Sequence, residues 1–285
     1  MADRVTIYEV GPRDGLQSQQ RLIATEDKIR LVDLLSDCGH SRIEVASFVS
    51  PKLVPQMADG AEVLAGIARR PGVAYAALIP NMRGYEAARA ARANEVAVFA
   101  SASEGFSRAN INATIAESLE RFRPVLVAAE ADGLPVRGYV SCVTDCPYDG
   151  PTPPASVARV TEALLAMGCY EVSLGDTIGS AVPATTAAML DAVLAVAPAA
   201  RLAGHFHDTR GRALDNIGVS LDMGISTFDA SAGGLGGCPF APGASGNVAT
   251  EAVVVMLNER GFETGLDLAR LALAASFARS LREVT

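Results

Sequence analysis

Short apolar runs that favour β-strands alternate with longer segments of helical periodicity along nearly the whole chain. The expected strands cover residues 5–10, 42–48, 74–79, 95–100, 137–143, 171–174, 202–207 and 227–231. The expected helices cover residues 26–37, 55–69, 85–92, 115–131, 155–167, 184–197, 213–223 and 248–260, and a further amphipathic helix covers 266–281. About eight strand–helix units favour an α/β fold of the closed parallel (β/α)8 TIM-barrel type, with an extra C-terminal helix. A doubly wound open sheet is the alternative, but it usually has fewer units.

The spacing of these units gives no sign of a second domain. Glycine follows several expected helices, as at Gly39 and Gly133, where a left-handed residue commonly ends a helix. No linker, low-complexity tract or longer repeat interrupts the pattern, and 285 residues suit one barrel. We therefore expect residues 1–285 to form a single domain.

Charge and cysteine usage limit the partners and the compartment. The net charge of −8 disfavours nucleic acid or an anionic membrane as the main partner. Residues 1–5 do not resemble a signal peptide, and no apolar run approaches the ~18 residues of a membrane span. Five cysteines, an odd number, indicate reduced thiols, so we expect a cytoplasmic protein. Cys142 and Cys146 have no matching pair nearby, so we interpret them as buried thiols and not as zinc ligands.

Two of the three histidines, His205 and His207, lie two residues apart at the end of an expected strand. Side chains at such a spacing point to the same face of a strand, so both imidazoles are suited to one metal ion. Surface or core histidines remain the alternative for an isolated pair. The other strand ends therefore decide between the two interpretations.

Polar side chains follow several other strands, at the end where barrel enzymes build their sites. Arg13 and Asp14 follow the first strand, and Glu44 interrupts the apolar second strand. A buried carboxylate needs a charged or hydrogen-bonding partner, for which Arg13 is a candidate. The sixth strand ends at Asp176, and the eighth continues into a glycine-rich loop, residues 233–239, that lacks the lysine of a phosphate-binding P-loop. Together these features favour an active site.

The sequence resembles the 3-hydroxy-3-methylglutaryl-CoA lyases, which belong to a larger group of metal-dependent barrel lyases and synthases. The resemblance extends from Ile7 to about Leu273. The matching segments are residues 9–17, 47–52, 54–57, 137–142, 167–179, 205–209 and 234–251. The glycine-rich loop with Cys238 is specific to the lyases, since the synthases generally lack it.

This resemblance implies four metal ligands, Asp14, His205, His207 and Asn247. The set suits an octahedral Mg²⁺ or Mn²⁺ with positions left for substrate oxygens. It also implies that the partners are an acyl-CoA thioester and a second copy of the chain in a homodimer.

The implied reaction is a retro-Claisen C–C cleavage of 3-hydroxy-3-methylglutaryl-CoA to acetyl-CoA and acetoacetate. By resemblance, Arg13 stabilises the enolate, Cys238 delivers a proton, and Glu44 orients Arg13. Either Asp14 or His205 removes the hydroxyl proton, and the sequence leaves this choice open. The family's pocket-lining positions correspond to Arg13, Gln17, Ser47, Asn110, Tyr139 and Thr177.

Some positions differ from the usual lyase pattern. Ser18-Gln19 replaces Asn-Glu, Arg210-Gly211-Arg212 replaces a Tyr-Gly-Gln-like segment, and Ala252 replaces an acidic residue. These changes leave open a related substrate such as citramalyl-CoA, although solvated arginines on the seventh helix are the slightly favoured explanation of Arg210 and Arg212. A metal-dependent hydrolase is disfavoured because hydrolase barrels carry this histidine pair on the first strand, and a non-catalytic acyl-CoA-binding protein is disfavoured by the complete residue set.

Overall fold

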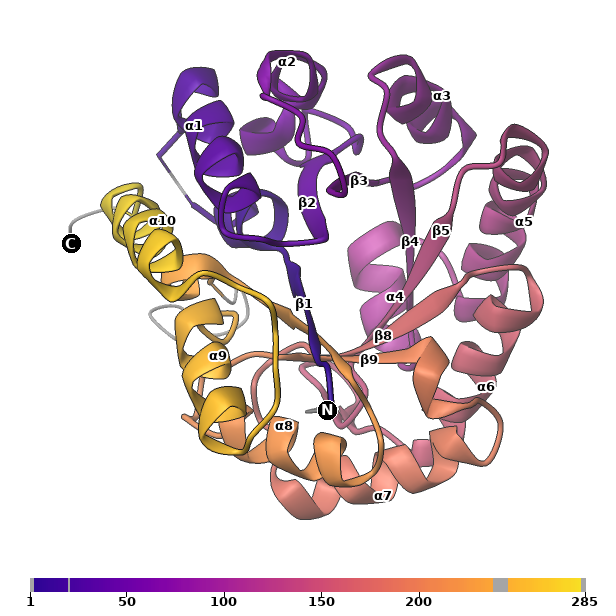
Figure 1. Ribbon diagram of the computed structural model, residues 1–285. Helices are drawn as coiled ribbons and strands as arrows, with labels where there is room; N and C mark the ends of the chain where they lie inside the picture. The colour runs from indigo at the N-terminus through magenta and orange to yellow at the C-terminus, as the bar shows by residue number, and fades with distance from the viewer. Residues whose placement is uncertain (1–2, 20, 238–245, 283–285) are drawn as a thin grey trace.

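The computed structural model describes residues 3–19, 21–237 and 246–282. Eight parallel strands form a closed barrel in the order β1-β10-β9-β8-β5-β4-β3-β2 (Figure 1). The strands are β1 (Thr6–Glu9), β2 (Arg42–Ser47), β3 (Ala74–Leu78), β4 (Glu95–Ser101), β5 (Val136–Ser141), β8 (Glu171–Asp176), β9 (Leu202–Phe206) and β10 (Thr227–Ala230). The predicted TIM barrel is therefore confirmed, and each expected strand overlaps an observed one.

Helices surround this barrel (Figure 1). They are α1 (Thr25–Ser36), α2 (Gly60–Gly66), α3 (Met82–Ala90), α4 (Glu104–Ile111), α5 (Ile115–Asp132), α6 (Pro154–Ala166), α7 (Pro183–Leu194), α8 (Ala213–Asp222), α9 (Thr250–Glu259) and α10 (Leu268–Ser280). The last of these is the predicted extra C-terminal helix. Glycine ends α5 as expected, because Gly133 adopts a left-handed φ of 67° at its C-terminus.

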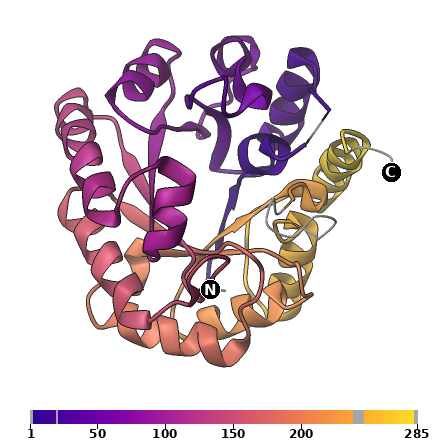
Figure 2. The same ribbon diagram turned by 180° about the vertical axis from the view of Figure 1, so that it is seen from behind.

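Four features differ from the sequence-based expectations. Residues 55–69 form not one helix but a 3₁₀ turn, Pro55–Met57, followed by the short helix α2. Helix α4 was not expected, and it lies in front of the strands in the view from behind (Figure 2). A small hairpin of β6 (Asp145–Cys146) and β7 (Gly150–Pro151) was also missed. The fifth strand stops before Val143 because Cys142 adopts a positive φ of 59°.

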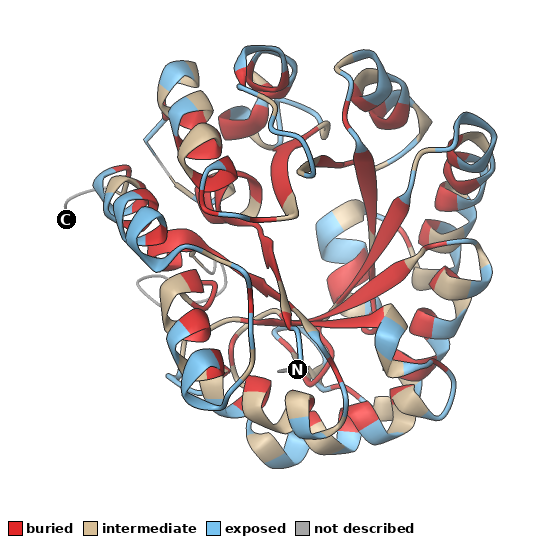
Figure 3. Cartoon of the chain, in the orientation of Figure 1, coloured by how far each residue is buried: buried red, intermediate tan, exposed pale blue. Residues whose placement is uncertain are grey.

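The strands are buried on both faces, and the helices turn their buried sides toward them (Figure 3). Aliphatic side chains fill the layer between strands and helices, which explains why the strand sequences are nearly continuous apolar runs. The space inside the barrel is different, because charged side chains such as Glu44, Arg137 and Asp229 are buried there. Buried charges require partners, so the barrel interior contains an ion-pair network.

The barrel closes where β1 pairs with β10, and a buried carboxylate secures this junction. Glu9 Oε1 accepts hydrogen bonds from the backbone N–H groups of Gly11 (2.9 Å) and Ala232 (3.0 Å), and its Oε2 accepts one from Thr250 Oγ1 (2.7 Å). Glu9 therefore connects the turn after β1 to the segment after β10 and to the start of α9. The turn after β1 and the residues just before α9 contribute to the site described next.

Candidate active site

The predicted metal ligands converge at the carboxyl ends of the strands. Asp14 lies in a π-helical turn after β1 (Gly11–Gly15), which Pro12 opens, whereas His205 lies on β9 and His207 just beyond it. One potential ligand atom from each of these three residues lies within 4.8 Å of those of the other two. Asp14 Oδ2 is 4.0 Å from His207 Nε2.

Asn247 reaches this cluster through backbone pairing. The segment around Asn247 runs antiparallel to the end of β9, with an isolated bridge between Asn247 and His207. Its flanking hydrogen bonds join Asp208 N to the Gly246 carbonyl (2.8 Å) and Val248 N to the Phe206 carbonyl (3.1 Å). As a result, Asn247 Nδ2 donates to Asp14 Oδ2 at 2.7 Å. All four predicted ligands are thus neighbours.

The chemistry of these donors fits a divalent cation. A carboxylate, two imidazoles and an amide oxygen are the oxygen and nitrogen ligands found around such ions. Burial, together with the nearby His205, lowers the pKa of His207 to about 4, so this imidazole is neutral at pH 7. Burial opposes ionisation of Asp14, but Arg13 and the two histidines outweigh it and hold the Asp14 pKa below its ordinary value. Both side chains can therefore offer lone pairs to a metal.

Arg13 links the metal cluster to the second strand. Its Nη1 donates to Asp14 Oδ1 at 2.6 Å, and its Nε donates to Glu44 Oε2 at 2.7 Å. The predicted pairing of Glu44 with Arg13 is thus observed, and both side chains are buried. Tyr139 also donates to Glu44 Oε2, at 3.2 Å, and its ring lies under the guanidinium of Arg13. The Arg13 guanidinium is held rigidly beside the metal ligands.

Two residues of this network were missed in the sequence. Asp229 on β10 lies beside His205 in the strand register, and its Oδ2 is 3.1 Å from His205 Nδ1. Arg137 on β5 forms a two-pronged ion pair with Asp229, with N–O distances of 3.0 and 2.7 Å. Both are charged residues inside apolar strands, which is the signal that identified Glu44.

The predicted substrate-lining residues occupy varied positions. Ser47 is buried at the end of β2, and its hydroxyl has no hydrogen-bond partner among the described residues. Thr177 follows β8, and its Oγ1 accepts a hydrogen bond from Cys142 N at 2.8 Å. Gln17 is partly exposed after the π-helical turn, whereas Asn110 is exposed on α4. The roles of these residues stay predictions.

Cys238, the predicted proton donor, lies outside the described residues. The chain is described up to Gly237 and again from Gly246, and these two ends meet closely. A Cβ atom placed on Gly246 would be 2.5 Å from the carbonyl carbon of Gly236. The two described ends of the chain on either side of Cys238, at Gly237 and Gly246, therefore both lie next to Asn247. The other predicted feature of the cysteines is confirmed, since Cys142 and Cys146 are buried free thiols.

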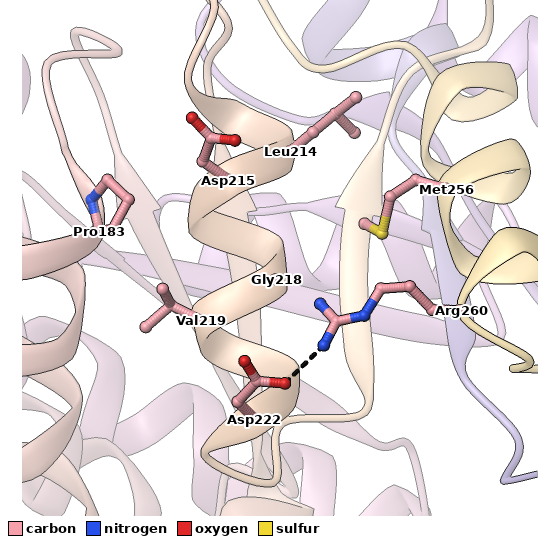
Figure 4. Close-up of a pocket in the computed structure, with 8 residues that line it drawn as sticks. All are labelled: Pro183, Leu214, Asp215, Gly218, Val219, Asp222, Met256 and Arg260. Carbon is pink, nitrogen blue, oxygen red and sulfur yellow. Dashed lines mark hydrogen bonds and ion pairs between the residues drawn. The ribbon is translucent and has the colours of Figure 1, made fainter.

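A separate groove of about 410 Å³ lies on the outer helical layer (Figure 4). It is lined by residues of α8 and α9 and by Pro183 at the start of α7, and the ion pair of Arg260 with Asp222 (2.5 Å) lies at one end. None of the predicted site residues lines it. The charged groups that could support catalysis are therefore at the barrel mouth and not in this groove.

A group of potential metal ligands at the mouth of a TIM barrel, flanked by a buried arginine, is the arrangement of a metal-dependent barrel enzyme. The HMGL-like family model matches residues 4–277, so the chain belongs to the HMGL-like family. Among the described residues, no helix is both long and apolar enough to cross a membrane.

Several known proteins resemble this chain over nearly its whole length. The crystal structure of the HMG-CoA lyase from Brucella melitensis has 66% sequence identity and a TM-score of 0.98, covering 99% of both chains. A Pseudomonas aeruginosa 3-hydroxy-3-isohexenylglutaryl-CoA/hydroxy-methylglutaryl-CoA lyase is 58% identical, over 93% of this chain and 88% of its own. An Acinetobacter baumannii HMG-CoA lyase, 37% identical with a TM-score of 0.92, was solved with coenzyme A and 3-methylmalate and covers 99% of this chain and 96% of its own.

Proposed function

We propose that this protein is a carbon–carbon lyase that cleaves 3-hydroxy-3-methylglutaryl-CoA to acetyl-CoA and acetoacetate. The observation that carries the proposal is the cluster of Asp14, His205 and His207 with Arg13 beside it. The identity of 66% and 58% to proteins named as lyases of this substrate supports the same conclusion. The small-molecule partner is accordingly an acyl-CoA thioester.

The ion proposed for the cluster is Mg²⁺ or Mn²⁺, held by Asp14, His205, His207 and Asn247. When bound, such an ion acts as a Lewis acid that makes the substrate hydroxyl easier to deprotonate. The carboxylate of Asp14 and the amide oxygen of Asn247 support this choice, because carboxylate and carbonyl oxygens suit Mg²⁺ and Mn²⁺.

The chain's own groups account for the remaining steps. Asp14 or His205 takes the proton of the C3 hydroxyl, the C2–C3 bond breaks, and its electron pair moves to the thioester as an enolate. Arg13 stabilises the enolate oxygen, because charge-assisted donors fixed in a buried site act most strongly where charge develops. Cys238 gives a proton to C2, which completes acetyl-CoA. Gln17, Ser47, Asn110, Tyr139 and Thr177 are the proposed substrate-binding residues.

We further propose that residues 1–285 form one domain, that the protein is a homodimer and that it is cytoplasmic. The continuous barrel supports the first proposal. The buried free cysteines among the described residues support a reducing compartment. Size-exclusion chromatography with light scattering tests the homodimer.

The direct experiment measures acetyl-CoA release from 3-hydroxy-3-methylglutaryl-CoA with Mg²⁺ and a thiol reductant. We expect rapid release that a chelator abolishes and that Cys238→Ala strongly reduces. The same assay with citramalyl-CoA tests the alternative substrate. That alternative loses part of its basis because Arg212 forms an ion pair with Asp215 (3.1 Å) and so adds less free positive charge. A clear preference for citramalyl-CoA would overturn the proposal.

A further inference from the structure

The buried guanidinium of Arg137, on β5, is connected to the candidate metal ligands through Asp229. Arg137 is fully buried, and its three nitrogens are all engaged. Nε donates to Glu171 Oε1 at 2.8 Å, while Nη1 and Nη2 donate to the two carboxylate oxygens of Asp229. The ring of Tyr8 packs against the guanidinium carbon at 4.0 Å. This side chain is fixed in both position and orientation.

One side of this network leads to His205. Asp229 Oδ2 accepts hydrogen bonds from Arg137 Nη1 and from Ser173 Oγ (2.7 Å), and it lies 3.1 Å from His205 Nδ1. A carboxylate paired with a guanidinium only accepts hydrogen bonds, so Nδ1 of His205 must carry the hydrogen. In the neutral imidazole, Nε2 is then the nitrogen with a free lone pair. Such carboxylate–histidine pairs commonly orient a metal-bound imidazole.

The other side leads to Arg13. Nη1 of Arg137 also donates to the hydroxyl of Tyr139, at 3.0 Å. That hydroxyl oxygen therefore accepts from Arg137, and its own hydrogen is free to point to Glu44 Oε2, which lies 3.2 Å away. The same oxygen of Glu44 receives Nε of Arg13. The orientation of Arg13 thus depends on Arg137 through Tyr139 and Glu44.

We infer that Arg137 and Asp229 are a positioning pair that holds His205 with Nε2 available to the metal and, through Tyr139 and Glu44, also orients Arg13. Both residues are buried, so we assign them a positioning role and no contact with the substrate. The inference rests on the proposed function only in that a metal occupies the cluster. One buried ion pair would then orient both a metal ligand, His205, and the arginine that stabilises the enolate, Arg13.

The first test determines by NMR which ring nitrogen of His205 carries the hydrogen in the protein of original sequence. The chain has only three histidines, so two-bond ¹H–¹⁵N spectra of ¹⁵N-histidine protein with Mg²⁺ give three sets of ring signals, which single His→Asn variants assign. We expect His205 to carry its hydrogen on Nδ1. Finding the hydrogen on Nε2 would overturn the inference, whether or not the protein cleaves the proposed substrate.

The second test measures Mn²⁺ affinity by electron paramagnetic resonance. We expect Asp229→Asn to weaken Mn²⁺ binding by about 10–100-fold, the effect usual for the partner of a metal-bound histidine. Glu171→Gln is the matched control, because it removes a different carboxylate from Arg137 and leaves the Asp229–His205 contact intact. It should bind Mn²⁺ within about twofold of the original protein.

A second variant guards against loss of folding, and another tests the side of the network that leads to Arg13. If Asp229→Asn does not fold, Ser173→Ala removes one hydrogen bond to Asp229 and should weaken Mn²⁺ binding measurably. On the side of the network that leads to Arg13, Tyr139→Phe should lower kcat and leave the Mn²⁺ affinity unchanged. Equal loss of Mn²⁺ affinity in Asp229→Asn and Glu171→Gln would mean that the network only maintains the fold, and wild-type affinity in folded Asp229→Asn would equally contradict the inference.

Discussion

Asn247 donates its Nδ2–H to Asp14 Oδ2 over 2.7 Å, although the two residues are 233 positions apart in the chain. Asn247 Nδ2 is also 3.3 Å from the carbonyl oxygen of Leu235, which lies in the glycine-rich loop. The amide of Asn247 therefore connects this loop to the turn after β1. The backbone bridge to His207 sets the position of Asn247 independently of its side chain. Its side chain can therefore be changed while its surroundings stay in place.

Replacing Asn247 by alanine should weaken metal binding with little effect on the fold. We expect Mn²⁺ affinity to fall by at least about 10-fold, comparable to the loss of a supporting residue, because one proposed ligand is gone. Isothermal titration gives the affinity, and the melting temperature without metal should change little. Asn258→Ala, at an exposed position on α9, is the control. Unchanged affinity in Asn247→Ala would exclude Asn247 as a ligand.

Replacing Arg13 by lysine should lower kcat by about 10²–10³-fold, the loss usual for one donor to a developing oxyanion. Lysine keeps the charge but cannot donate from one planar group to both Asp14 and Glu44. Steady-state kinetics with saturating Mg²⁺ measure the effect. Arg123→Lys, at an exposed ion pair with Glu120, should leave kcat unchanged. A lysine variant with the original kcat would show that the forked geometry is not needed.

The stability of the protein should depend on pH through Glu9. Burial raises the pKa of Glu9 from 4.5 to about 7, although three hydrogen bonds to the carboxylate oppose the shift. Between these pH values the folded protein binds more protons than the unfolded chain, so stability falls as pH rises. The contribution is complete below pH 4.5 and is lost as pH passes 7, with a size on the order of 3 kcal/mol.

Glu9→Gln removes this titration and keeps an oxygen that can accept from Gly11 and Ala232. We expect the variant to gain stability relative to the original protein as pH rises from 5 to 8, as measured by urea unfolding. Glu120→Gln, an exposed change on α5, should follow the original protein at every pH. Parallel curves for Glu9→Gln and the original would mean that Glu9 is ionised throughout.

The glycine contact at the ends of the cysteine loop should tolerate no side chain. In Gly246→Ala the new Cβ would lie 2.5 Å from both the Gly236 carbonyl carbon and the Gly237 nitrogen, so the two ends must move apart. We expect stability to fall by about 1–3 kcal/mol, as for other overpacked sites, together with a lower kcat. Gly218→Ala on α8 meets only the end of the flexible Arg260 side chain, and it should be neutral or slightly stabilising. Melting curves and kinetics compare the two.

The barrel was predictable from sequence because each strand and helix has its own local period. Helix α4 was not, because its start depends on distant contacts. Ser103 caps the helix, but Asp149, 46 positions away, accepts the hydrogen bond of the Ser103 hydroxyl and that of Gly105 N. The sequence around residues 103–111 does not include Asp149, so the local pattern alone could not predict this helix.

The candidate site was predictable where polar residues follow a strand, as Asp14 and His207 do. Asp229 and Arg137 lie inside strands, and their importance comes from which strands are neighbours. The sequence alone does not say that β10 places Asp229 next to His205. The pairing of strands, and with it the network beneath the metal cluster, required the three-dimensional structure.

The hydrogen bond between Thr250 and Glu9, 241 positions apart, also constrains how the protein is made. During synthesis the strand that carries Glu9 emerges first, whereas β10, the last strand of the barrel, and the start of α9 emerge more than 200 residues later. Until then both outer edges of the growing sheet are unpaired and open to association with other chains. The proposed set of metal ligands is likewise complete only after Asn247 has been added to Asp14, His205 and His207, when more than four-fifths of the chain has been translated.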